Sequence, residues 1–89
     1  MKDTEQDTID ATKLEIVRAL KVLPSPLMMP EKTLRAQVAI AMPRRPSYDL
    51  VTDAILALTA EGIMHSVCNT LTGIKYSLTD EGRGAAAEV

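Results

Sequence analysis

The chain has 89 residues, a net charge of −2 and an apolar fraction of 46%, which suits one small domain with a modest core. It has two Tyr and no Phe or Trp. The core must therefore be aliphatic, and a stacking platform for single-stranded nucleic acid, which needs several exposed aromatic side chains, is excluded. A single cysteine, Cys68, excludes an internal disulfide and a cysteine-based zinc site.

The amino-terminal sequence MKDTEQDT is polar and acidic, unlike a signal peptide. No apolar run approaches the roughly 20 residues that cross a membrane as a helix. We therefore expect a cytoplasmic location, no membrane association and neither a cofactor nor a metal.

The small net charge hides an uneven distribution. Residues 13–45 carry seven basic side chains against two acidic ones, a net charge of +5, whereas residues 1–12 and 46–89 are both negative. Such a split can give one small domain a basic face beside acidic ones.

The first helix is expected to begin near Thr8 or Asp10, either of which can act as its N-cap. The preceding residues 1–7 are charged and without periodicity, which predicts a disordered segment. Pro24 and Pro26 end the helix, because proline lacks an N–H and clashes with the preceding turn. Apolar residues at helical spacing form the buried face: Ile9, Ile16, Val17, Leu20 and Leu23.

The second and third helices follow a short apolar run, Leu27-Met28-Met29. Pro30 lies at or before the start of the second helix, where its missing N–H costs nothing, and Glu31 favours the same turn through the helix dipole. Ser47 can cap the third helix, and Gly62 ends it. The expected buried residues are Leu34, Val38, Ala41 and Met42 in the second helix, and Leu50, Val51, Ala54, Ile55 and Leu58 in the third.

The last third of the chain predicts a hairpin and a short helix. An apolar, partly β-branched run follows Gly62 and leads to a loop that ends at Gly73. A second, alternating run follows, in which Ile74, Tyr76 and Leu78 are apolar. Thr79 can cap a final helix, and residues 85–89 are expected to form a tail.

Two short motifs support a resemblance to a known fold. They are the pattern L-x-x-x-G-I at 58–63 and the sequence LTDEGR at 78–83. In these motifs, and in the order of elements over residues 8–84, the chain resembles a winged helix-turn-helix domain, broadly similar to MarR-type and PadR-type DNA-binding regulators. The resemblance implies an α+β, mainly helical fold: three helices, a short strand at 27–29 that pairs with the wing, a two-stranded wing and a short C-terminal helix.

The resemblance also implies a function. In such domains the third helix enters the major groove of double-stranded DNA, and the wing contacts the adjacent minor groove or phosphates. The recognition helix here would be residues 47–61, and its exposed face would include Tyr48, Asp49, Thr52 and Asp53. Pro43 and Pro46 enclose two arginines in a rigid turn before it. The candidate phosphate contacts are Lys32, Arg35, Arg44 and Arg45, and the candidate wing contacts are Asn69 and Lys75.

The exposed face of the third helix departs from the usual pattern. It carries two carboxylates one turn apart, Asp49 and Asp53, and no basic residue. Phosphates repel carboxylates, although Asp can accept a hydrogen bond from cytosine N4. Two hypotheses therefore stay open. The first is a small DNA-binding transcriptional regulator, expected to be a homodimer. The alternative is a protein-interaction module that uses the acidic face together with Leu56.

Catalysis has little support in the sequence. Ser66, His65 and Cys68 lie close together in the chain, but no third residue that would orient them is evident. We interpret them as strand residues, and Asp49 and Asp53 as solvated charges rather than an acid–base pair. We therefore expect that the protein is not an enzyme.

Overall fold

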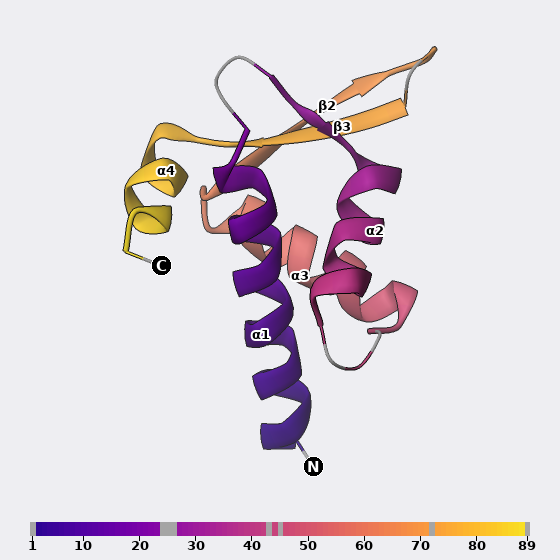
Figure 1. The fold of residues 1–89 in the computed structure, drawn as a ribbon, viewed down its shortest axis with the longest axis vertical. Coiled ribbons are helices and arrows are strands. Elements are labelled where there is room, and N and C mark those ends of the chain that lie inside the picture. The colour runs from indigo at the N-terminus through magenta and orange to yellow at the C-terminus, as the bar shows by residue number, and fades with distance from the viewer. Residues whose placement is uncertain (1, 24–26, 43, 45, 72, 89) are drawn as a thin grey trace.

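The computed structural model describes residues 2–23, 27–42, 44, 46–71 and 73–88. Its elements in chain order are helix α1 (Lys2–Lys21), strand β1 (Met29–Pro30), helices α2 (Glu31–Ala41) and α3 (Tyr48–Ala60), strands β2 (Met64–Asn69) and β3 (Gly73–Leu78), and helix α4 (Asp80–Ala86). The strands form an antiparallel sheet in the order β1-β3-β2. The sheet lies across one end of the helices, and the hairpin β2–β3 extends beyond them as a wing (Figure 1).

Helix α1 is longer than expected. It begins at Lys2, whereas the sequence predicts a start near Thr8 or Asp10 after a disordered segment over residues 1–7. Its first turns extend away from the rest of the molecule (Figure 1). Extending an existing helix costs far less free energy than nucleating one, so residues 2–7 are helical without an apolar face of their own. Within the described residues, no helix is both long enough and apolar enough to cross a membrane.

The core is aliphatic, as the composition predicts, except for the buried ring of Tyr76. It lies between α1, α2, α3 and the inner face of the sheet, and α4 adds Ala86 to it. Most residues of the expected stripes are buried, but Ala41 is exposed and four residues are half-buried: Ile9, Leu23, Met42 and Leu50. In α2 the buried face is narrow, because only Leu34 and Val38, one turn apart, reach the core. Sequence reasoning missed Thr12, which is buried and donates its hydroxyl hydrogen bond to the Thr8 carbonyl oxygen over 2.7 Å.

The sheet contains the short strand that the resemblance implies, but at Met29–Pro30 rather than over residues 27–29. Met29 pairs with Tyr76, and Pro30 pairs with Lys75. In β3 the side chain of Tyr76 points toward the helices and is buried. Because side chains alternate along a strand, Lys75 and Ser77 lie on the outer face of the sheet. The predicted helix ends at Pro24 and Pro26 lie outside the described residues, as does Pro43 of the predicted turn.

The base of the wing is closed by a close contact between two backbone segments. Gly62 ends α3 with a φ of +77°, a conformation that favours glycine. The Thr79 N–H then donates to the Ile63 carbonyl oxygen over 3.0 Å, and the Thr79 hydroxyl caps α4 by accepting from the Gly82 N–H over 2.9 Å. Gly82 lies directly on Ile63, so that a Cβ at this position would overlap the Ile63 carbonyl oxygen. We name these residues, Gly62, Ile63, Thr79 and Gly82, the hairpin closure.

Helix α4 reaches further than the predicted boundary between domain and tail. It continues to Ala86, whose side chain is buried, whereas the sequence predicts a tail over residues 85–89. The difference has two causes: alanine strongly favours helix, and Ala86 is buried in the core.

Candidate nucleic-acid interface

Helices α2 and α3 form the candidate helix-turn-helix. The Ser47 hydroxyl caps α3 by accepting from the Leu50 N–H over 3.1 Å. The predicted exposed face of α3 is present: Tyr48 is 66% exposed and Leu56 61% exposed, and both Asp49 and Asp53 face solvent. The helix contains no basic residue, so its outward surface is acidic and partly apolar.

Arg35 on α2 is bound to α3. One of its terminal nitrogens, Nη2, donates to the Thr52 hydroxyl over 2.8 Å and to the Glu31 carboxylate over 3.2 Å. The other, Nη1, donates to the Tyr48 carbonyl oxygen over 3.2 Å. The guanidinium carbon lies 3.8 Å from the centre of the Tyr48 ring, a cation–π distance. The predicted phosphate contact Arg35 and two predicted groove residues, Tyr48 and Thr52, are therefore brought together and bind one another.

Glu31 links this cluster to the wing. Its carboxylate accepts from the Arg35 guanidinium and, over 3.3 Å, from the Tyr76 hydroxyl on β3. Burial of the phenol, together with the adjacent Glu31 carboxylate, raises the pKa of Tyr76 to about 12. Sequence reasoning assigned Glu31 only to the helix dipole and Tyr76 only to the strand pattern. We name Glu31, Arg35, Tyr48, Thr52 and Tyr76 the Arg35 cluster.

The other candidate cations lie around this cluster. Lys32 on α2 and Arg44 in the turn are exposed, and Lys75 is half-buried on the outer face of β3. Among the described residues these three cations form no ion pair. Arg45 lies outside the described residues. Three of the predicted phosphate and wing cations are thus available to an anion, whereas Arg35 is already bound.

The wing offers little charge. Lys75 is its only Lys or Arg residue. The Asn69 side chain accepts a hydrogen bond from the Leu71 N–H over 2.8 Å, so Asn69 shapes the turn as well as being a predicted wing contact. Leu71 is 93% exposed and Val67 is also exposed. Among its described residues, the tip of the wing therefore exposes one large apolar side chain, Leu71, and carries no cation.

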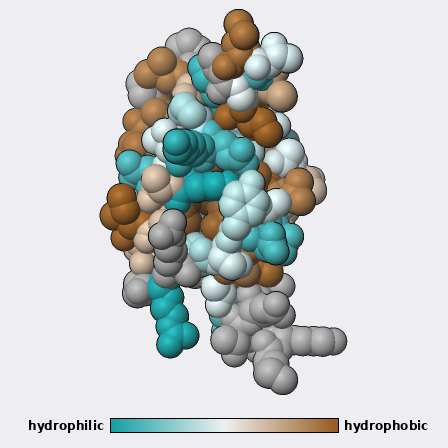
Figure 2. Space-filling model, turned by 90° about the vertical axis from the view of Figure 1, so that its right-hand side faces the viewer, coloured by the Kyte–Doolittle hydropathy of each residue, from teal (hydrophilic) through white to brown (hydrophobic). Residues whose placement is uncertain are grey.

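Figure 2 shows the molecule from the side toward which the wing extends in Figure 1. Hydrophilic side chains gather in the middle of this face, and hydrophobic ones lie around them, including at its upper end. The surface is thus mixed in character.

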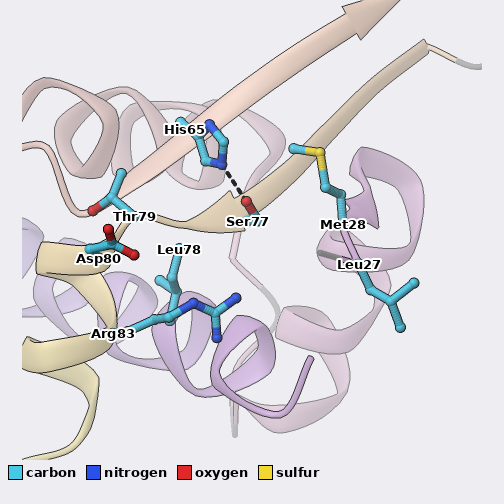
Figure 3. A pocket seen from close by; sticks show the side chains of 8 residues that line it. All are labelled: Leu27, Met28, His65, Ser77, Leu78, Thr79, Asp80 and Arg83. Atoms are coloured by element: carbon cyan, nitrogen blue, oxygen red, sulfur yellow. Dashed lines mark hydrogen bonds between the residues drawn. The ribbon is translucent and has the colours of Figure 1, made fainter. Parts of the chain in front are cut away.

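A cavity of about 430 Å³ lies elsewhere, on the outer face of the sheet. Its lining includes Leu27, Met28 and Arg83, together with His65 and Ser77, which are hydrogen bonded to each other (Figure 3). These two are cross-strand partners. Ser66 and Cys68 alternate to the other face of β2, so they do not form a Ser/His/Cys group with His65.

Comparison with known proteins supports the fold. No family model and no curated protein matches the chain. Among solved structures, the crystal structure of a MarR-family transcriptional regulator from Silicibacter pomeroyi superimposes with a TM-score of 0.69 over 96% of this chain, at 16% sequence identity. This chain has a winged-helix fold. It spans about half of that regulator, 53% of whose chain is covered.

Proposed function

We propose that this winged helix binds double-stranded DNA as part of a transcriptional regulator. The observation that carries the proposal is the arrangement of α2, the exposed α3 and the wing, in a fold shared with a transcriptional regulator. In such folds the exposed helix meets the major groove and the wing contacts the neighbouring backbone.

The proposed phosphate contacts are the cations that the Arg35 cluster leaves available. Lys32 lies on α2 beside the start of α3, and Arg44 lies in the turn before α3. Arg45 adjoins Arg44 in the sequence, and Lys75 contributes from the wing together with Asn69. Four cations support binding that rests mainly on phosphate neutralisation. Asp49 and Asp53 limit the affinity, and Asp53 favours cytosine where it reaches a base edge. A homodimer would double the number of contacts, and its solution mass should be measured alongside binding.

The test is a fluorescence-anisotropy titration with a mixed-sequence DNA duplex at several salt concentrations. Lys32→Met and Arg44→Met should each reduce the slope of log K against log salt by about 0.9, because each removes one phosphate contact. Lys21→Met is the matched control: it removes an exposed cation at the end of α1, beside α4, and should leave the slope unchanged. Absence of binding at low salt and high micromolar protein would refute the proposal.

A second candidate function is a protein-interaction module. The exposed Leu56 lies on the same helix as Asp49 and Asp53, a combination that suits a partner with basic and apolar side chains. In a pull-down, Leu56→Asp or Asp53→Lys should release such a partner. Retention of the partner by both variants would exclude this use of α3.

A further inference from the structure

The guanidinium of Arg35 has few donors left for a ligand. Three of its N–H groups already donate to Thr52, Glu31 and the Tyr48 carbonyl. Its Nε is buried and has no partner among the described residues, so a phosphate cannot reach it. The side chain as a whole is only 18% exposed, and the Glu31 carboxylate offsets much of its charge.

The same contacts join three elements. Arg35 and Glu31 come from α2, Tyr48 and Thr52 from the first turns of α3, and Tyr76 from β3. These are the elements that the proposed function brings to the DNA. An arginine suits such a junction, because its planar guanidinium donates in several fixed directions while it stacks on an aromatic ring.

We propose that Arg35 is a positioning residue: it holds α3 at a fixed orientation to α2 and, through Glu31 and Tyr76, to the wing, and it does not contact phosphate. Its effect on DNA binding, which rests on the proposed function, is therefore geometric. The Thr52 hydroxyl accepts from Arg35 and donates to the Tyr48 carbonyl. It therefore helps to position α3 as part of the Arg35 cluster and does not recognise a base.

The salt dependence of DNA binding separates a positioning residue from a phosphate contact. Arg35→Met should weaken binding of the mixed-sequence duplex about tenfold at every salt concentration, with an unchanged slope. Thr52→Val keeps the charge of Arg35 and the shape of Thr52 but removes the hydroxyl. It should weaken binding about threefold, again without a change in slope. Lys32→Met, on the same helix, is the control that should lower the slope by about 0.9.

Two results together would overturn the inference. The slope of log K against log salt would be lower by about 0.9 in Arg35→Met, and Thr52→Val would bind DNA like the native chain. If Arg35→Met does not fold, Thr52→Val alone decides, because an unaltered affinity in that variant contradicts positioning through the Arg35 cluster.

A measurement without DNA separates this inference from the proposed function. Residual dipolar couplings of the backbone amides report the orientation of α3 relative to α2. Arg35→Met and Thr52→Val should change that orientation, and Lys32→Met should not. If the native chain binds no DNA, the proposed function fails, while unchanged couplings in both cluster variants would independently refute the positioning role.

Discussion

The hairpin closure, which begins two residues after α3, and the exposed face of α3 are opposite in character. In the closure, Thr79 is hydrogen bonded to the backbone of Ile63, and Gly82 lies against the same backbone with no space for a Cβ atom. On α3, Asp53 and Leu56 point into solvent. The difference teaches that the fold restricts which side chains the hairpin closure can accept. On the exposed face of α3 the fold imposes no such restriction, so the side chains there can suit a binding partner. Substitutions in the two regions should therefore affect different properties.

The largest expected effect is that of Gly82→Ala. The new Cβ would overlap the Ile63 carbonyl oxygen, and because the neighbouring atom is backbone, α4 must move away from the sheet. We expect a loss of about 4 kcal/mol or more in the free energy of unfolding. Gly84→Ala is the matched control on the same helix, since nothing lies within 4 Å of its added Cβ. It should stabilise by roughly 0.5–1 kcal/mol. Urea unfolding followed by circular dichroism measures both, and equal midpoints would contradict the close contact.

A smaller effect is expected at Thr79, the residue of the hairpin closure whose side chain makes the hydrogen bonds. Thr79→Ala removes the hydroxyl that caps α4 by accepting from the Gly82 N–H and that donates to the Gly62 carbonyl oxygen. The expected loss is about 1–2 kcal/mol. Thr79→Ser keeps the hydroxyl and should recover most of that stability. Equal losses in the alanine and serine variants would show that the methyl group, not the hydroxyl, matters here.

The smallest effect on stability is expected on the exposed face of α3. Asp53→Asn should change the free energy of unfolding by no more than about 0.5 kcal/mol, because the side chain is exposed. It should nevertheless strengthen binding to mixed-sequence DNA at low salt about threefold, through loss of repulsion from phosphate. Thermal unfolding and anisotropy on the same sample provide the comparison. Weaker binding in Asp53→Asn would instead indicate that the carboxylate accepts a hydrogen bond from the DNA.

The order of helices, strand and wing followed from local signals in the sequence. Proline and glycine mark element ends, Ser47 and Thr79 are good N-caps, and alternation in β3 separates Tyr76 from Lys75. These signals act over a few residues, so one sequence suffices to find them. The extent of α1 was missed because its first turns have no apolar face, and helix extension needs none.

The Arg35 cluster could not be predicted in the same way. Its members come from three elements, and Glu31 and Tyr76 are 45 residues apart. A charge count identifies Arg35 as one of the cations in the basic segment, but only the packing of α2 against α3 and β3 shows that the cation is already bound. The exposure of Asp49 and Asp53 was predicted from helical spacing. Their functional role, in contrast, depends on the molecule that binds α3.

The order of strands in the sheet has a consequence for how the protein avoids unwanted association. β1 and β2 form the two edges. β1 has only two residues, and the second, Pro30, lacks an N–H, so this edge gives another strand little to pair with. β2 has six residues and ends in the exposed segment that contains Val67 and Cys68. Growth of the sheet by an added strand is therefore directed to the β2 edge, which is where strand-mediated aggregation of a destabilised variant should begin.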